Sequence, residues 1–143
     1  AMAGKEYGKA EERFRTALQS TPRDYAANVL MAKCQAAQND QAQALQYART
    51  AAQIYPQEAQ AQKLVGVLAL GQKDPAAAYE HLDRYDKLLP GDAGVTFLKG
   101  VSLEGMGKRQ EAATQYAAYL KRSQQGKAAE YSYSRLKSWG YIK

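Results

Sequence analysis

The sequence repeats itself with a period of 34 residues, and this period restricts the possible folds more than any other feature. Prolines, alanines and small residues each recur in register at that interval. The three sets are Pro22, Pro56 and Pro90; Ala10, Ala44, Ala78 and Ala112; and Ala32, Gly66, Gly100 and Ser134. A unit this short cannot bury its own apolar face, so consecutive units must stack to form one continuous core.

Each period contains two helical patterns joined by a short turn, as residues 25–56 illustrate. In residues 25–38, apolar side chains recur at i, i+3, i+4 and i+7, the spacing of one helix face; they are Ala27, Leu30, Met31 and Cys34. Residues 41–55 repeat the pattern with Ala44, Ala48, Ala51 and Ala52. Asp40 suits an N-cap, and Pro56 ends the second helix because it lacks an N–H donor. The pattern predicts a helical hairpin.

A helical hairpin of 34 residues resembles the tetratricopeptide repeat. That family places a large apolar or aromatic residue four positions after the alanine of its second helix. Here the position holds Phe14, Ala48, Leu82 and Tyr116 in successive repeats. The resemblance covers nearly the whole chain. It implies an all-α fold, an α-solenoid of tetratricopeptide helical hairpins that forms a right-handed superhelix with a C-terminal capping helix.

We expect a single domain made of three full repeats between two helices. The second helix of a truncated repeat is predicted at residues 4–22, the repeats at 25–56, 59–90 and 93–126, and the capping helix at 127–139. Gly4 corresponds to the turn inside a repeat, so the chain is expected to be a fragment of a larger protein. Its first helix would then expose an apolar face open to self-association. Tyr133 is expected to point inward from the capping helix, together with Ala129 and Leu136.

Small residues and two polar positions shape the expected packing. Ala32, Gly66 and Gly100 fall where the two helices of a hairpin cross, and their size lets the backbones approach. Lys99 replaces an apolar residue on a buried stripe, so its amine is expected to reach solvent along the surface of the core. The acidic side chains Asp83 and Asp86 are expected on solvent-facing surfaces.

Two tyrosines occupy a repeat position that holds alanine earlier in the chain. Tyr85 and Tyr119 stand where Ala17 and Ala51 stand in the first repeats. We therefore expect the later repeats to pack differently, with phenol hydroxyls that need hydrogen-bond partners.

No residue pattern predicts catalysis, a metal site or a cofactor. His81 is the single histidine, which excludes a zinc site built on two histidines of this chain. Residues 105–108, Gly-Met-Gly-Lys, lack the spacing of a phosphate-binding loop and predict a turn between helices. The longest apolar run, residues 64–70, is far shorter than the ~20 residues of a membrane-spanning helix. We expect a chain that is not an enzyme and binds no cofactor.

The positive charge is concentrated at the C-terminal end. The formal net charge is +6, and the last 36 residues carry eight Lys or Arg against Glu111 and Glu130. This excess is either a docking patch for an acidic partner, such as nucleic acid or an anionic membrane, or the solvated face of a capping helix. A modest excess is not the clustered stripe of a nucleic-acid site, so nucleic acid is not the expected partner.

Stacked hairpins curve, and their first helices line a concave groove suited to a protein or an extended peptide. The family register places these residues in that groove: Val29, Lys33, Ala36, Gln60, Lys63, Val67, Leu70, Phe97, Val101, Glu104, Tyr131 and Arg135. Packing between repeats is an alternative role for Val67, Leu70 and Val101. A clamp for a C-terminal carboxylate is not expected, because its slots hold Val29 and Leu64.

Two functional hypotheses follow. The first is a non-catalytic scaffold that binds a protein or peptide in its groove. The second is an accessory domain that recruits substrates for a bacterial M48-type zinc-dependent protease whose catalytic domain lies upstream. It rests on residues 133–141, Tyr-Ser-Arg-Leu-Lys-Ser-Trp-Gly-Tyr, which are similar to the carboxyl ends of such proteases that carry tetratricopeptide repeats. That resemblance implies a periplasmic or extracytoplasmic parent; the sequence itself leaves the compartment open.

Overall fold

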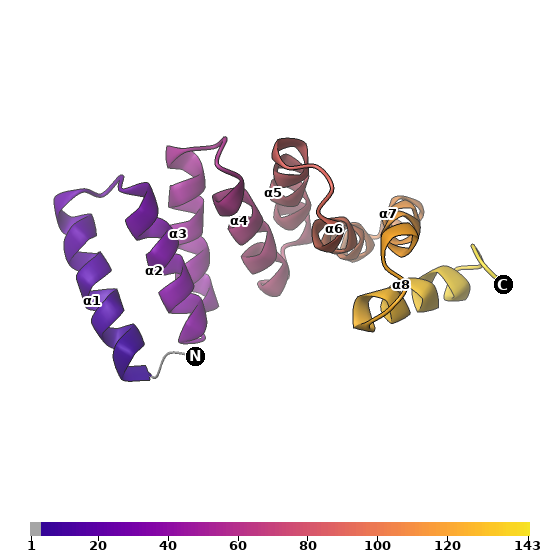
Figure 1. Cartoon of the computed structure of the whole chain (residues 1–143), viewed down its shortest axis with the longest axis horizontal. Helices are drawn as coiled ribbons and strands as arrows, with labels where there is room; N and C mark the ends of the chain where they lie inside the picture. The colour runs from indigo at the N-terminus through magenta and orange to yellow at the C-terminus, as the bar shows by residue number, and fades with distance from the viewer. Residues whose placement is uncertain (1–3) are drawn as a thin grey trace.

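The chain folds into a row of helices, with no strand among the residues that the structure describes. The computed structural model describes residues 4–143 (Figure 1). Within them lie eight helices: α1 (Gly4–Ser20), α2 (Tyr25–Ala37), α3 (Gln41–Ile54), α4 (Ala59–Gly71), α5 (Pro75–Leu88), α6 (Ala93–Gly105), α7 (Arg109–Arg122) and α8 (Lys127–Ser138). The all-α prediction is confirmed.

Successive helices pack as consecutive hairpins. α2 pairs with α3, α4 with α5 and α6 with α7, while α1 packs on α2 and α8 packs on α7. In Figure 1, α1 to α5 run up and down the page, α6 and α7 are viewed nearly along their axes, and α8 lies across the view. The helix axes therefore turn along the row, as in a helical repeat whose units are each rotated relative to the last.

Aspartate residues start four of the helices. The carboxylates of Asp24, Asp40, Asp74 and Asp92 each accept a hydrogen bond, of 3.0 to 3.2 Å, from the backbone N–H three residues later. Each bond satisfies a donor that has no partner inside the helix. The N-cap predicted at Asp40 is confirmed, and Asp74 caps α5 in the same way directly before Pro75.

The turns inside the hairpins share one backbone conformation. Asn39, Lys73 and Gly107 follow one another at the repeat period and have φ angles of 65°, 60° and 78°. This left-handed conformation costs little in glycine and asparagine but is uncommon in a residue such as lysine. Residues 105–108 form the predicted turn between helices, with Gly107 in the left-handed position.

Two glycines permit the close crossing predicted for the hairpins. A Cβ atom on Gly66 would lie 2.6 Å from Cγ of Leu82, and one on Gly100 would lie 2.8 Å from Cε1 of Tyr116. Real carbon atoms do not approach this closely, so each helix pair depends on the missing side chain.

The buried apolar residues form two separate clusters. The aliphatic cluster consists of alanine, valine and leucine from α2 to α6: Val29, Ala32, Ala44, Leu45, Ala48, Ala51, Ala52, Ala61, Val65, Leu68, Ala69, Ala78, Leu82 and Val95. The aromatic cluster is built around Tyr116 with Leu103, Ala112, Ala113 and Leu136, and partly buried side chains such as Phe97 and Trp139 pack against it. The boundary between the clusters lies where α5 meets α6.

Three side chains differ from the sequence prediction. Leu30 is 41% exposed instead of buried, because the buried face of α2 turns toward α1 and α3 and is completed by Val29 and Asn28. Tyr133 is 48% exposed, and Ser132 takes the inward position between Ala129 and Leu136. The amine of Lys99 does not reach solvent, since the residue is only 6% exposed and pairs with two aspartates.

Helix α1 is less deeply buried than the helices that follow it. Ala10, Phe14 and Leu18 are all only partly buried, in contrast to the fully buried alanines of α3. This agrees with the partial exposure expected for an apolar face on the first helix.

Candidate functional site

A largely apolar hollow lies over α2, α4 and α5. It is an open cavity of about 400 Å³. Its lining residues are Lys33 from α2, Gln60, Lys63, Leu64 and Val67 from α4, and Tyr85 and Leu89 from the end of α5. Four of these, Lys33, Gln60, Lys63 and Val67, were predicted to face the groove. We call this hollow the α4 groove.

Aliphatic side chains at the α4 groove are unusually accessible. Val67 is 43% exposed and Leu89 is 54% exposed, so both present apolar surface to solvent. Leu64 lines the same hollow and is half-buried. Exposed apolar surface that lines a concavity and is flanked by charged groups is typical of a binding site for a protein or peptide.

The sequence prediction missed Leu64, Tyr85 and Leu89 as groove residues. Leu30, Leu64 and Leu98 recur at the repeat period. That recurrence, on a face distinct from the buried alanines, was the available signal. Leu89 lies just beyond the end of α5, in a turn that helical periodicity does not place.

A small polar network borders the α4 groove. The amine of Lys63 donates to Oδ2 of Asp92 at 3.1 Å, and the hydroxyl of Tyr85 donates to the same oxygen at 3.0 Å. The Lys63 amine also lies 5.3 Å from the centre of the Tyr85 ring, within range of a cation–π interaction. The hydroxyl partner expected for Tyr85 is thus Asp92.

This network keeps Asp92 ionised. Partial burial raises the pKa of its carboxyl, but hydrogen bonds from Lys63, Tyr85 and the backbone N–H of Val95 outweigh burial and hold that pKa below the usual value. The bond to Asp92 raises the pKa of the Tyr85 hydroxyl. Lys33, which also lines the groove, is exposed and has no ion-pair partner among residues 7–143.

The predicted groove residues near the C-terminal end pack against one another instead of lining the same cavity. The ring of Phe97 lies 5.4 to 5.9 Å from those of Tyr116, Tyr119 and Tyr131. Val101 is half-buried against the aromatic cluster. These side chains fill the space where α6, α7 and α8 meet.

Glu104 holds three elements together at this end. Its carboxylate accepts hydrogen bonds from the hydroxyls of Tyr116 at 2.7 Å and Tyr131 at 3.1 Å, and it pairs with Arg135 at 3.1 Å. Burial, followed by the bond to Glu104, raises the pKa of the Tyr116 hydroxyl far above its usual value. The predicted set of Glu104, Tyr131 and Arg135 is therefore brought together as a packed network.

Three other predicted groove residues belong to the interior. Val29 is 4% exposed within the aliphatic cluster, so its side chain is not available to a ligand. Leu70 and Ala36 are half-buried against that cluster. The family register assigned these residues to the concave side by position alone, whereas neighbouring helices cover their side chains.

No arrangement suited to metal binding occurs among the described residues. His81 is half-buried, and its Nδ1 atom lies 2.8 Å from Oε1 of Gln62, whose amide donates to the carbonyl of Pro56 at 2.9 Å. Burial lowers the pKa of His81. Within residues 4–143, no group of three or more His, Cys, Asp or Glu side chains is placed to hold a metal ion, and no helix is long and apolar enough to span a membrane.

Part of the C-terminal positive charge is used in packing. The guanidinium groups of Arg109 and Arg135 lie 5.4 and 4.8 Å from the centre of the Trp139 ring. Both contacts fall within cation–π range, so these two arginines stabilise the aromatic cluster.

Comparisons with known proteins agree with this architecture. A family model described as the tetratricopeptide repeat matches residues 1–68. A crystal structure of MamA superposes with a TM-score of 0.80 at 15% identity, covering 91% of this chain and 78% of that one. YrrB, described as a TPR protein with an unusual peptide-binding site, gives 0.75 at 14% identity over 92% of this chain and 68% of its own. No curated protein matches the chain.

A plant domain gives the same result. The TPR domain of Arabidopsis OM64 superposes with a TM-score of 0.71 at 14% identity, covering 80% of this chain and 95% of that one. At such low identities these matches establish a shared fold. They do not indicate which ligand this chain binds.

Proposed function

Because this chain is a tetratricopeptide repeat protein, we propose that it is a non-catalytic scaffold that binds an extended peptide segment of a partner protein in the α4 groove. Tetratricopeptide repeats generally bind proteins or peptides. The observation that carries the proposal is the combination of accessible apolar side chains, Val67 and Leu89, with a concavity of about 400 Å³. That space accommodates one or two side chains of an extended segment.

The charges beside the groove favour a particular ligand. Lys33 and Lys63 lie on the lining of an otherwise apolar hollow. Lys33 is exposed and has no carboxylate partner in the part of the chain that the structure describes. A peptide with an aliphatic residue next to an Asp or Glu would bury its apolar side chain against Val67 and place its carboxylate near Lys33. The proposed contact residues are Lys33, Gln60, Lys63, Leu64 and Val67.

Peptide selection tests the groove directly. A phage-displayed library of random ten-residue peptides is panned against the whole chain, and the selected peptides are measured by fluorescence anisotropy. We expect enrichment of peptides that pair an aliphatic with an acidic residue. Val67→Glu should weaken their binding at least tenfold, since it places a charge on the apolar wall; Lys33→Glu should weaken it roughly fivefold by repelling the ligand carboxylate.

Leu88→Glu is the matched control. Leu88 is also on α5 and is 38% exposed, but it lies in a different hollow with Pro56 and Arg84. It should leave peptide affinity unchanged. If the selected peptides bind Val67→Glu as tightly as wild type, or lose affinity only with Leu88→Glu, the α4 groove is not the binding site.

A role as the accessory domain of a zinc protease is a second proposal. It is motivated by residues 133–141 alone, and none of the matches described above is a protease. It requires a His-Glu-x-x-His motif upstream in the same reading frame, which sequencing of the parent gene would reveal. A parent frame without that motif would remove this possibility and leave the scaffold role untouched.

A further inference from the structure

A buried charge interrupts the core where α5 meets α6. Positions 31, 65 and 99 are equivalent in successive repeats and hold Met31, Val65 and Lys99, which are 0%, 0% and 6% exposed. Lys99 therefore takes the place of a fully buried apolar side chain. The aliphatic and aromatic clusters meet at this interface, where Val95 and Leu98 of α6 pack with the aliphatic cluster and Tyr79 of α5 packs against the aromatic cluster.

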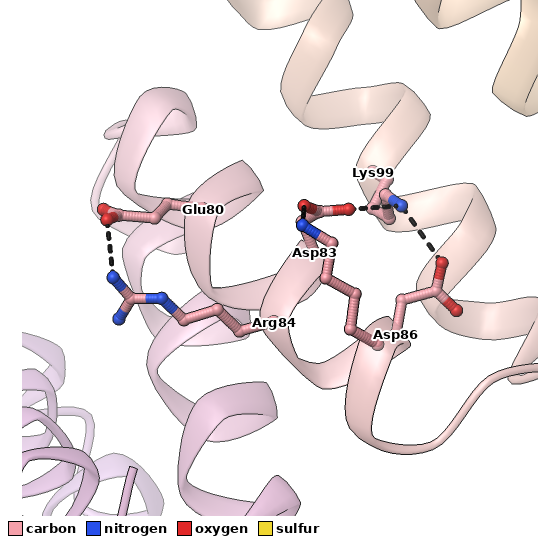
Figure 2. Close-up of polar contacts among 6 residues, drawn as sticks. Glu80, Asp83, Arg84, Asp86 and Lys99 are labelled. Carbon is pink, nitrogen blue, oxygen red and sulfur yellow. Dashed lines mark hydrogen bonds and ion pairs between the residues drawn. The ribbon is translucent and has the colours of Figure 1, made fainter. Parts of the chain in front are cut away.

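The Lys99 amine is neutralised by two carboxylates of the preceding helix. It donates to Oδ1 of Asp83 at 3.0 Å and to Oδ2 of Asp86 at 3.1 Å, as Figure 2 shows. The remaining oxygen of Asp83 pairs with Lys87 of the same helix at 3.1 Å. The sequence prediction of solvent-facing aspartates is wrong at both positions, because these side chains turn toward Lys99 and are only 27% and 30% exposed.

An aromatic ring adds to the two carboxylates around the amine. The ring of Tyr79, one turn before Asp83, lies 5.6 Å from the Lys99 amine. The neighbouring Glu80–Arg84 pair is exposed, lies away from Lys99 in Figure 2 and makes no contact with it. Burial alone would lower the pKa of Lys99, but the two aspartates outweigh it and raise that pKa. Lys99 is therefore charged, and both aspartates stabilise that charge.

A second ionic contact attaches the start of α6 to the preceding repeat. Asp92, the N-cap of α6, accepts from Lys63 of α4 and from Tyr85 of α5. Helix α6 is thus held to the previous hairpin by charged groups at two places. One repeat earlier, the positions equivalent to Tyr79, Asp86 and Lys99 hold Leu45, Ala52 and Val65, and all three belong to the aliphatic cluster.

We propose that the α5–α6 interface is an electrostatic joint that couples two otherwise separate folding units, α1–α5 and α6–α8, through Lys99, Asp83 and Asp86. In a stacked-repeat protein, the free energy of each interface between neighbours decides whether the array unfolds as one unit. A buried ion pair contributes little over an apolar contact while intact. It becomes strongly destabilising once one partner is removed, because an unpaired charge is left in the interior. This interface is therefore the place where one substitution separates the two units.

The single tryptophan makes the separation measurable. Trp139 packs on the aromatic cluster, so its fluorescence reports α6–α8, whereas far-ultraviolet circular dichroism reports all the helices. In urea unfolding of the whole chain, we expect the two signals of the wild type to share one midpoint at neutral pH. Lys99→Ala should lower the fluorescence midpoint below the dichroism midpoint by about 1 M urea.

Lys99→Met is the decisive companion variant, because methionine is the residue at the equivalent position 31. It replaces the ion triad by apolar contact and should restore coincident midpoints. Asp86→Asn, which leaves Lys99 with one carboxylate, should separate them as Lys99→Ala does, and Glu80→Gln in the exposed pair should not. The proposal would be overturned if the fluorescence and dichroism midpoints coincide in both Lys99→Ala and Asp86→Asn, as they do in the wild type. A Lys99→Met variant whose midpoints separate as far as those of Lys99→Ala would overturn it as well.

Discussion

The same position of the repeat holds Ala48 in α3, Leu82 in α5 and Tyr116 in α7. All three residues are fully buried, yet they belong to regions of different chemistry. Around the first two, the core is aliphatic and the concave side is open at the α4 groove. Around Tyr116, the core is aromatic and the concave side is filled by Phe97 and Tyr131.

The two regions show how one repeat accommodates such different side chains. The position that faces the large residue changes with it: Gly66 faces Leu82 and Gly100 faces Tyr116, whereas Ala32 occupies the equivalent site in the repeat that has Ala48. A large residue at this position is thus accommodated by a glycine on the facing helix, whereas alanine faces alanine in the repeat with the small residue. The aliphatic region leaves space for a ligand, while the aromatic region uses that space for its own side chains.

The largest expected effect comes from emptying the aromatic cluster. Tyr116→Ala should destabilise the chain by about 4 kcal/mol, because it removes a fully buried ring and leaves a cavity. Urea unfolding followed by circular dichroism measures this loss. Tyr116→Phe, which removes only the hydroxyl that Glu104 accepts, should cost about 1 kcal/mol. A similar cost for both variants would mean that the hydrogen bond, and not the ring, holds the cluster.

Substitutions at the facing residues Gly66 and Leu82 test the aliphatic region. Gly66→Ala should destabilise by about 2 kcal/mol, since its Cβ would overlap Leu82. In a chain that already carries Leu82→Ala, the same change should cost much less, because the pair then matches Ala32 and Ala48. A double-mutant cycle in urea measures this coupling. Strictly additive costs would contradict the coupling between these two facing positions.

The joint between the regions should respond to pH. Burial raises the pKa of Asp83, but the bonds from Lys99 and Lys87 outweigh it and place that pKa below the usual value, so its stabilising effect is present above about pH 4 and is lost on acidification below that. The pKa of Lys99 is raised, so its contribution is complete below about pH 10.4 and is lost as the pH rises further. Urea midpoints should fall in both ranges and stay level between them. Lys99→Met should flatten the alkaline fall.

The smallest expected effect concerns an exposed cation. Arg109→Ala should destabilise by about 0.5 kcal/mol, because it removes a partly solvated contact with the Trp139 ring. The tryptophan emission should shift slightly while the α4 groove keeps its affinity for selected peptides. A loss of peptide affinity would show that the two regions are more closely linked than the separate clusters indicate.

Periodicity predicted the helices because it depends on local spacing alone. The hairpins, the aspartate caps and the small residues at the crossings could all be predicted from the register. The position of Leu30 and Tyr133 could not, since each helix here is covered from two sides and a single amphipathic stripe describes only one of them. The pairing of Lys99 with Asp83 and Asp86 depends on the contact between two repeats, which spacing within one repeat does not contain.

The groove was predicted in part for the same reason. Lys33, Gln60, Lys63 and Val67 follow from the register of the first helices. Leu89 lies in an irregular turn, and Glu104 has the register of a groove residue but is occupied by Tyr116, Tyr131 and Arg135. Whether a concave position is open or filled depends on side-chain sizes across the interface, which become visible only when the repeats are assembled.

The carboxylate of Asp92 accepts more hydrogen bonds than it needs to stay ionised. Besides Lys63, it is bonded by the Tyr85 hydroxyl and by the backbone N–H of Val95 at the positive end of a helix dipole. The acidic side chain of a ligand can therefore attract the Lys63 amine while Asp92 keeps its hydrogen bonds from Tyr85 and Val95. The Lys63 amine can pair with the carboxylate of a bound ligand and return to Asp92 when the ligand dissociates. Reversible binding would therefore leave the start of α6 intact.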